Sequence, residues 1–464
     1  MTRAEPRVPS FVMDQPVLHV LARYFAESER LRAFVSDPRA ARVSEPLLPL
    51  FVAALWLERG GPLVCVLPED AEARDVAEAA GWLLGEENVG LLASRGVRWG
   101  SGLEPPPHLV GERARALEVL ARDGLVCASA IGAGEGIPPA GARPETIRLR
   151  VGDEPGTEAL MERLALAGYE RVEQAQERGQ FAVRGGIVDI FPATGREPVR
   201  LEFFGDEVES VRAFSAFTQR TLHPVDEAVI YPAAERRLDL VQPWLEEGSR
   251  PAPGDLVRPL ARVDLVWDAD EVDRVAREEL GEPPSLRGAV KLSQLPAGQP
   301  YAFEAQRPAV AARGLSEAER DLTAFIRAGN RVVVTFAHRG EALRTKALLR
   351  RIEAVVLEPG DQLPEEPGLL FAVAPVRRGF VLRDLGLVLL PDTQVFRKRP
   401  PRADVRVGRA LQSFADLRTG DHVVHEDHGV GRLLGFETKT VAGVTRDYLF
   451  LAFRGDDRLY VPHE

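Results

Sequence analysis

A strand-like run that breaks at a glycine pair, at residues 181–192, constrains the fold of this chain more than any other feature. Large apolar residues alternate there with Ala182 and Arg184 up to Gly185-Gly186. Alternation with a period of two is typical of a half-buried strand, and glycine inside a strand pattern often marks a β-bulge. The sequence therefore predicts a β-rich segment with a bulge at the glycine pair.

A second strand-like run follows at residues 199–207. Its alternation places Arg200, Glu202 and Phe204 on one face and three apolar residues on the other. A cation, an anion and an aromatic ring on one rigid face can hold a protein partner. An ordinary solvated sheet face explains the same pattern, so both interpretations stay open at this point.

Length and composition limit the classes of protein to consider. A chain of 464 residues is too long for one core, so several domains are expected. The net charge is −11 and no broad basic domain stands out, which is unlike a protein that binds DNA along its length. The longest apolar run, 46–57, is too short to span a bilayer, and the two cysteines, Cys65 and Cys127, lie in apolar runs typical of buried strands. We therefore expect a cytoplasmic protein with no membrane partner.

Shifts in composition along the chain predict an α/β multidomain architecture. Strand–helix alternation favours a first α/β domain that is interrupted by a β-rich insertion, followed by a second α/β domain. Four or five short strands near the end of the chain favour a small SH3- or Tudor-like β-barrel. The predicted boundaries are 1–145 for the first part of the first domain, 146–222 for the insertion, 223–300 for the second part, 301–396 for the second α/β domain, 397–410 for a basic linker and 411–464 for the barrel. The linker is expected to be extended and solvated, and a contact between it and nucleic acid stays open.

The motif that carries a first family resemblance runs from about residue 168 to 222. It includes Gly168-Tyr169-Glu170-Arg171-Val172, the two strand-like runs described above and residues 217–222. This string resembles the UvrA-binding segment shared by UvrB and the bacterial transcription-repair coupling factors. The resemblance implies a binding site for UvrA and a UvrB-like α/β domain around the insertion.

The second resemblance lies in residues 420–432, in Asp447-Tyr448-Leu449 and in residues 458–462. These segments resemble the RNA polymerase-interacting domain of the coupling factors (the Mfd family), a module that CarD-type transcription regulators share. UvrB has only the first module and CarD regulators only the second, so both modules in this order single out the coupling factors. The family would add another short stretch after residue 464, so we expect a truncated chain that ends before the family's ATP-driven motor.

The two resemblances together imply an adaptor that binds the β subunit of stalled RNA polymerase and recruits UvrA for nucleotide excision repair. In the family an ATP-dependent DNA translocase follows, so ATP, Mg²⁺ and most contacts with DNA are expected in that motor. No G-x-x-x-x-G-K-[ST] loop occurs in the sequence, so we expect neither a cofactor nor a catalytic residue in this fragment. Two alternatives remain, namely an ATP-dependent damage-verification protein of the UvrB type and a CarD-type regulator that only binds polymerase.

Candidate UvrA-binding residues follow from the first resemblance. Four charged positions match positions that UvrB-type segments use for contact: Arg171, Arg184, Arg200 and Glu202. Arg200 and Glu202 match a cation–anion pair. Phe204 is added from the strand alternation alone. Ala182 stands where UvrB has a further arginine, so one contact is expected to be missing.

The polymerase contact strand of the family corresponds to roughly residues 433–441. As an edge strand it would bind a partner mainly through main-chain hydrogen bonds, with side chains such as Lys439 adding selectivity. Alternation predicts one face with Leu434, Phe436, Thr438 and Thr440, and another with Leu433, Glu437, Lys439 and Val441.

Three histidines near this strand have a spacing that invites a metal site: His422, His425 and His428. On an extended chain, residues three apart point to opposite faces, so the three rings do not converge easily. We expect structural histidines and no metal.

Overall fold

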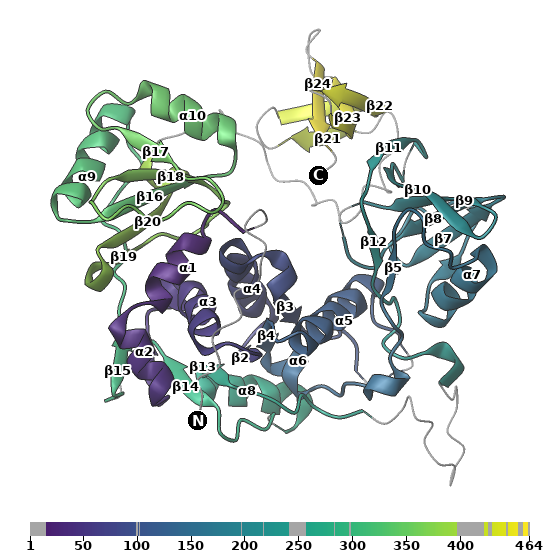
Figure 1. Cartoon of the computed structure of the whole chain (residues 1–464), viewed down its shortest axis with the longest axis horizontal. Coiled ribbons are helices and arrows are strands. Elements are labelled where there is room, and N and C mark those ends of the chain that lie inside the picture. The colour runs from purple at the N-terminus through teal and green to yellow at the C-terminus, as the bar shows by residue number, and fades with distance from the viewer. Residues whose placement is uncertain are drawn as a thin grey trace. The chain divides into compact units, whose positions relative to one another are not determined.

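The computed structural model describes residues 15–98, 101, 103–195, 197–216, 218–240, 257–282, 284–296, 298–396, 422–425, 429–441, 444–452 and 458–462. The predicted basic linker, 397–410, lies outside the described residues. The chain divides into two compact units, one with Met1–Leu103, Glu112–Ile137 and Val257–Lys398, the other with Glu104–Gly111, Pro138–Leu256 and Arg399–Glu464. Figure 1 shows several separate sheets with helices, so the predicted mixed α/β multidomain class is confirmed.

A seven-stranded parallel sheet forms the centre of the first unit (Figure 1). Its strand order is β15 (Tyr301–Phe303), β1 (Ala41–Val43), β14 (Val290–Ser293), β13 (Leu265–Trp267), β2 (Leu63–Leu67), β4 (Leu125–Ser129) and β3 (Val89–Leu92). The strands β2 and β4 are buried along their whole length. A parallel sheet with both faces covered needs such continuous apolar strands, which is why they read as unbroken hydrophobic runs.

Helices cover both faces of this sheet. Leu63, Cys65 and Leu67 share a core with α1 (His19–Ala26), α2 (Glu29–Ser36), α3 (Leu48–Arg59) and α4 (Asp70–Leu84). Val64 and Val66 point to the other side, into a core with α5 (Pro107–Ala121), α6 (Ala130–Gly134) and α8 (Ala269–Leu280). The two cores are separated by the sheet, in the arrangement that βαβ connections produce.

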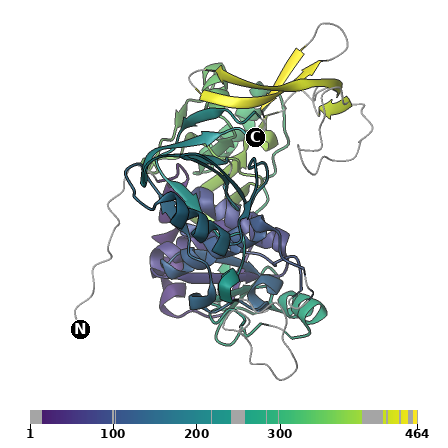
Figure 2. The same ribbon diagram turned by 90° about the vertical axis from the view of Figure 1, so that its right-hand side faces the viewer.

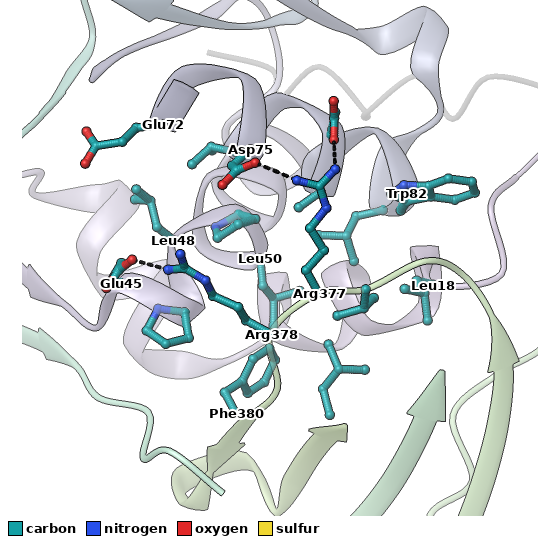
Figure 3. A pocket seen from close by; sticks show the side chains of 18 of the residues that line it. Leu18, Glu45, Leu48, Leu50, Glu72, Asp75, Trp82, Arg377, Arg378 and Phe380 are labelled. Atoms are coloured by element: carbon teal, nitrogen blue, oxygen red, sulfur yellow. Dashed lines mark hydrogen bonds and ion pairs between the residues drawn. The ribbon is translucent and has the colours of Figure 1, made fainter. Parts of the chain in front are cut away.

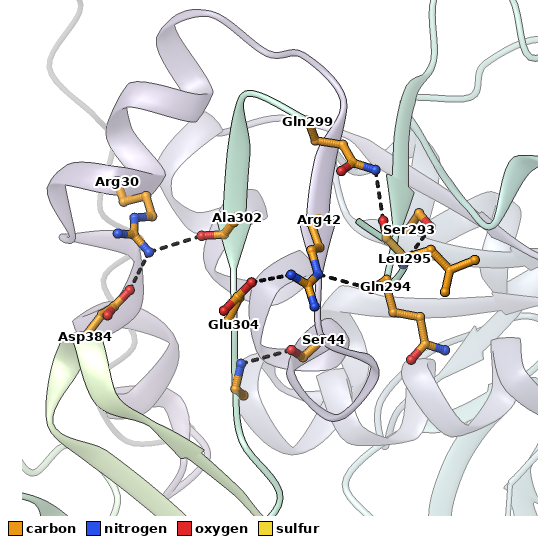
Figure 4. Close-up of polar contacts among 11 residues, drawn as sticks. Arg30, Arg42, Ser44, Ser293, Gln294, Leu295, Gln299, Ala302, Glu304 and Asp384 are labelled. Carbon is orange, nitrogen blue, oxygen red and sulfur yellow. Dashed lines mark hydrogen bonds and ion pairs between the residues drawn. The ribbon is translucent and has the colours of Figure 1, made fainter. Parts of the chain in front are cut away.

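The strands of this sheet come from both sides of the β-rich insertion, and the sheet extends to residue 303. β15 pairs in parallel with β1. Figure 4 shows the polar contacts that hold this edge: Arg42 binds Glu304 at 2.6 Å and the Gln294 carbonyl oxygen at 3.2 Å, and Arg30 contacts the Ala302 carbonyl oxygen at 3.1 Å. Tyr301 and Phe303 also bury their rings against Phe34, so residues 301–303 belong to the first sheet.

A second α/β lobe occupies the rest of the first unit. Its sheet has the order β17 (Ala354–Val356), β18 (Leu369–Val373), β16 (Arg331–Phe336), β20 (Leu387–Pro391) and β19 (Phe380–Leu382), with only β19 antiparallel to its neighbour. The helices α9 (Leu315–Arg327), α10 (Arg339–Leu348) and α11 (Asp392–Val395) contribute to the core on one face. The predicted strands at 331–336, 369–372 and 387–390 are all present.

The β-rich part of the second unit is a six-stranded sheet with one covering helix, α7 (Thr157–Leu166). The order is β11 (Thr221–Pro224), β10 (Glu207–Phe214), β9 (Val199–Phe204), β8 (Ile187–Phe191), β7 (Gln180–Arg184) and β6 (Glu170–Arg171), antiparallel except for β6 and β7. Outside this sheet, β5 (Ile147–Leu149) pairs with β12 (Ala228–Ile230). This pairing joins residues 228–230 to residues 147–149.

The glycine pair at 185–186 is a hairpin turn, and the predicted β-bulge is wrong. Arg184 pairs with Ile187 directly across it, which leaves Gly185 and Gly186 as a two-residue loop between β7 and β8. Gly185 has a φ of +60°, a conformation that tight hairpin turns require and that side chains other than glycine rarely adopt.

The C-terminal segment is a four-stranded antiparallel sheet in chain order, seen as long yellow strands in Figure 2. Its strands are β21 (His422–His425), β22 (Gly429–Val441), β23 (Val444–Ala452) and β24 (Arg458–Pro462). These match the four strands predicted from the sequence. Leu433, Leu449 and Leu451 form a small core on one face.

Candidate functional site

One face of the six-stranded sheet carries the predicted UvrA-binding residues. The opposite face is buried against α7 through residues such as Phe181, Val188 and Leu201. Across the strands, Ile187 pairs with Glu202 and Asp189 pairs with Arg200. The register therefore brings Arg184, Arg200 and Glu202 to the same outer face, which we call the outer sheet face.

Arg200 on β9 is held by Asp189 on β8. The guanidinium donates to both carboxylate oxygens, at 2.6 and 2.8 Å, and the Asp189 residue is only 2% exposed. Hydrogen bonding to Asp189 raises the pKa of Arg200 above its usual range, although burial opposes the shift. The same guanidinium lies 5.0 Å from the centre of the Phe214 ring. Arg200 is therefore partly buried and already paired within the fold.

Glu202 lies on the same face of β9 as Arg200, and it accepts a hydrogen bond of 2.8 Å from the Ser210 hydroxyl on β10. Asp189 is the residue that the sequence reasoning missed. A carboxylate between Val188 and Ile190, in an otherwise apolar strand, needs a cationic partner when it is buried, and that signal could have identified it.

Exposed positions on the same sheet remain available to a partner. Phe204 is 79% exposed at the end of β9, next to the turn at Gly205, which makes it the most exposed large apolar side chain in the described part of the chain. Arg184 is exposed and makes one long hydrogen bond of 3.4 Å to the Gln219 side chain. Arg171 is exposed on β6, at the edge of the sheet. These three residues are accessible, in contrast to Arg200.

Gln219 links two of the arginines and was not predicted. Its carbonyl oxygen accepts from Arg200 at 3.2 Å, its side-chain oxygen accepts from Arg184 at 3.4 Å, and its side-chain amide donates to the Ala216 carbonyl oxygen at 2.8 Å. Gln219 has a φ of +58°, an uncommon conformation for a residue other than glycine. Nothing in the sequence pattern indicates this role, because it depends on how the loop before β11 folds over the sheet.

The candidate polymerase strand, β22, is paired unequally along its length. Residues 429–432 pair with β21, whereas residues 432–441 pair with β23. Among the described residues, the part of β22 beyond residue 432 therefore has a strand neighbour on one side only. Such an open edge presents backbone groups that a partner strand can use.

A bulge in β22 changes the predicted alternation. Leu433 pairs with Leu451 and Gly435 pairs with Phe450, so Leu434 is the additional residue. Beyond the bulge, residues 436, 438 and 440 pair with residues 449, 447 and 445. A bulge shifts the alternation of a strand by one residue, and the predicted alternation did not include it. Leu433 is fully buried and Leu434 is 40% exposed.

The protein's own polar contacts occupy the carboxyl ends of β2 and β3. Asp70, at the start of α4, accepts hydrogen bonds from the Ser94 backbone N–H at 2.8 Å and from the Ser94 hydroxyl at 2.6 Å. Nearby, the buried Glu135 accepts from the Arg95 backbone N–H at 2.8 Å and pairs with the buried Arg113 at 3.3 Å. The Asp70 carboxylate, which follows β2, opposes the binding of a triphosphate at this point.

A cavity of about 420 Å³ lies in the first unit between α1, α3, α4 and the segment before β19 (Figure 3). Its walls are mostly apolar, with Leu50, Trp82 and Phe380 among them. At its rim Arg377 pairs with Asp75 at 3.1 Å and with Glu78 at 3.4 Å, Arg378 pairs with Glu45, and burial raises the pKa of Glu72. Carboxylates outnumber guanidinium groups there, so the cavity does not suit a nucleotide.

Two further properties concern the described residues alone. None of their helices combines the length and the apolar character needed to cross a membrane. No three of their histidine, cysteine, aspartate or glutamate side chains are placed to hold a metal ion together.

The comparisons with known proteins match two segments of the chain to families. Residues 147–235 match the UvrB interaction domain, and residues 417–464 match the CarD-like/TRCF RID domain. The first segment contains the outer sheet face and the second contains β22.

Curated relatives match most of the chain. The transcription-repair-coupling factors of Mycobacterium bovis, Myxococcus xanthus and Staphylococcus aureus are 28%, 28% and 24% identical, over 90%, 86% and 77% of this chain. The matches cover 43%, 42% and 38% of those proteins, so the chain spans less than half the length of these relatives. The resemblance to the transcription-repair-coupling factors that the motifs predicted is confirmed.

Proposed function

We propose that this chain is an adaptor in transcription-coupled DNA repair, with one end that binds RNA polymerase and another that binds UvrA. The observation that carries the proposal is the presence of both matched modules in one chain, a UvrB interaction domain at 147–235 and a CarD-like/TRCF RID domain at 417–464. Relatives named transcription-repair-coupling factors match the sequence of this chain over most of its length. A protein that couples transcription to DNA repair needs contacts with both RNA polymerase and the repair proteins.

The outer sheet face is the proposed UvrA-binding surface. Its proposed contact residues are the exposed Arg171, Arg184 and Phe204. Exposed charged residues in an interface mainly set specificity and association rate. Arg200 and Glu202 contribute by fixing the sheet through Asp189 and Ser210. The expected role of Arg200 in the interface thus becomes a positioning role.

The open edge of β22 is the proposed polymerase-binding surface, with the β subunit as its partner. Backbone groups of residues 433–441 would pair with a strand of that subunit, and Lys439 would add selectivity. We also propose that β21–β24 close into a small SH3- or Tudor-like barrel. The partly one-sided pairing of β22 suits either an open sheet or a barrel with one free edge.

The whole protein is proposed to be an ATP-dependent DNA translocase acting in the cytoplasm, with ATP and Mg²⁺ bound in a motor outside this sequence. For the present chain we propose no ATP hydrolysis. The Asp70 carboxylate after β2 supports this proposal, together with the missing phosphate loop of the sequence.

Binding of the purified chain to RNA polymerase and to UvrA, separately and together, tests the proposal. We expect each partner to bind alone and both to be retained in one complex on size-exclusion chromatography. Binding to polymerase without UvrA would favour a CarD-type regulator. DNA-stimulated ATP hydrolysis, in a preparation free of contaminating ATPase, would favour a UvrB-type enzyme.

A further inference from the structure

The helix α10 of the second α/β lobe is attached to its sheet by little apolar contact. Only Ala342 is buried among its ten residues. Leu343 and Leu348 on the same helix are 46% and 55% exposed. Large apolar side chains that stand exposed on one element often mark a contact surface for another protein.

A groove of about 550 Å³ runs beside α10. One wall is formed by Leu343 and Lys346 of the helix, and the other by Arg350 and Glu353 of the segment that leads into β17. Leu349 and Ile352 also line it and pack against the core of the lobe. Figure 1 shows α10 next to β17, and Ala354, the first residue of β17, completes the groove. The groove therefore combines an apolar floor with charged walls.

The charge around this groove is positive, although the protein has a net charge of −11. Three exposed cationic side chains line the groove: Lys346, Arg350 and Arg351. Arg351 lies near the buried Glu319, and its charge helps to lower the pKa of that carboxyl group. Arg339 at the start of α10 is bound to Glu358 at 2.6 and 2.7 Å. Glu353 is the one carboxylate among the described residues that line the groove.

The strand next to the groove has an open side. Among the described strands β17 pairs only with β18. The Leu357 backbone N–H donates to the Phe371 carbonyl oxygen of β18 at 2.8 Å. Because successive residues of a strand direct their backbone groups to alternate sides, those of Ala354 and Val356 face away from β18. An extended chain in the groove can therefore continue along this edge.

We propose that the groove between α10 and β17 binds an extended acidic and apolar peptide segment of a partner protein. Its leucine-like side chains would cover Leu343, and its carboxylates would meet Lys346 and Arg350. Main-chain hydrogen bonds to Val356 would fix its direction. The three-residue edge is short, so the groove and its charges supply most of the affinity.

A nucleic acid fits these observations less well than a peptide does. Phosphates would match the three cations, but they would leave Leu343 exposed, and a phosphate backbone cannot add to a strand edge. The site lies at residues 343–356, outside both segments that match known families, and it is independent of the proposed contacts with polymerase and UvrA.

The test uses the full chain and three fluorescein-labelled probes: a short peptide of alternating aspartate and leucine, the same peptide with lysine in place of aspartate, and single-stranded DNA of equal charge. Fluorescence anisotropy measures their binding at low and high salt. We expect the acidic peptide to bind most tightly, and salt to weaken its binding because exposed charges are screened. Tighter binding of the DNA or of the lysine peptide would overturn the proposal.

Substitutions in the groove locate the site. Lys346→Glu with Arg350→Glu should weaken binding of the acidic peptide by about tenfold or more, since it reverses both facing charges. Leu343→Asp should weaken it as well, and Val356→Pro should weaken it a few fold without disturbing the pairing with β18. The neutral variant Lys346→Gln with Arg350→Gln should weaken peptide binding less. It replaces the charge-reversal variant in the test if charge reversal perturbs folding.

The matched control is Arg307→Glu with Arg327→Glu. Both arginines are exposed and neither lines the groove, so this variant changes the net charge equally. Binding should then stay close to that of the unmodified chain. Equal losses in the control and groove variants, or no loss in a folded groove variant, would overturn the assignment.

Discussion

Arg200 and Asp189 form a two-point ion pair across neighbouring strands, with donor–acceptor distances of 2.6 and 2.8 Å. The pair lies on the outer sheet face, where the sequence alone predicts freely exposed contact residues. It divides that face into a fixed part around Arg200 and an accessible part around Arg184 and Phe204. The predictions below separate these two roles.

Arg200→Ala should destabilise the six-stranded sheet by about 3 kcal/mol, because it leaves the buried Asp189 carboxylate without its cation. Arg184→Ala is the control and should change stability by no more than about 0.5 kcal/mol, as exposed substitutions usually do. Hydrogen exchange of the β8 and β9 amides measures the local stability, since a chain of several domains does not unfold in one step. Equal exchange in the two variants would mean that the ion pair adds no stability.

Arg184→Glu and Phe204→Ala should each weaken binding to UvrA by at least about 1 kcal/mol, because an exposed cation and an exposed aromatic ring are lost from the proposed contact. Isothermal titration calorimetry measures the affinity. Arg163→Glu, an exposed cation on α7 that covers the other side of the sheet, is the control and should bind normally. Unchanged affinity of both folded contact variants would show that UvrA binds elsewhere.

Two neighbouring proline substitutions test the open edge of β22. Successive backbone N–H groups of a strand point to opposite sides, so one of Glu437→Pro and Thr438→Pro removes a bond to β23 and the other removes an N–H from the open edge. The variant that loses a bond to β23 should disturb the hairpin of β22 and β23. The variant that loses an N–H of the open edge should keep the fold but abolish binding to polymerase. Lys439→Ala should have a smaller effect. Circular dichroism and a pull-down with polymerase distinguish the cases, and a folded edge variant with normal binding would place the docking strand elsewhere.

Asp264 should make the first unit sensitive to acid. Burial alone would raise the pKa of Asp264, but hydrogen bonds from Arg262 and from the Val64 backbone N–H outweigh it and hold the pKa below its usual value. A lowered folded pKa means stability that is present above the unfolded pKa, about 4, and is lost as the pH falls through the folded value. Asp264→Asn should therefore lower the melting temperature at pH 7 and show a smaller difference below pH of about 4. A constant difference over this range would contradict the linkage.

Cys65 and Cys127 should not react with a thiol reagent in the folded protein. Both are fully buried on neighbouring strands, and burial raises the pKa of Cys127 to about 12, so almost no thiolate is present at neutral pH. Titration with a chromogenic disulfide should find no reactive thiol under native conditions and two in denaturant. Rapid reaction of the native protein would show that this sheet opens readily.

The sequence predicts the elements that depend on local pattern. The buried strands β2 and β4, the alternation on β9 and the four C-terminal strands follow from patterns that a short window contains.

Other features depend on contacts that no short window contains. The partner of Arg200 is set by the register between β8 and β9, and the position of Leu434 is set by a bulge that the alternation does not reveal. The role of Gln219 requires the folded loop before β11. The turn at Gly185 is a nearer miss, since two glycines between strand-like runs fit a hairpin as well as a bulge.

The mixed origin of the seven-stranded sheet has a consequence for synthesis on the ribosome. Cys65 on β2 lies opposite Leu265 on β13, 200 residues later in the chain. The ribosome therefore synthesises the whole β-rich insertion before β13 can pair with β2. Pairing at such separation slows folding, because the chain must close a long loop first. During that interval the apolar edge of β2 is unprotected, so the nascent chain should depend on chaperones more than its finished stability suggests.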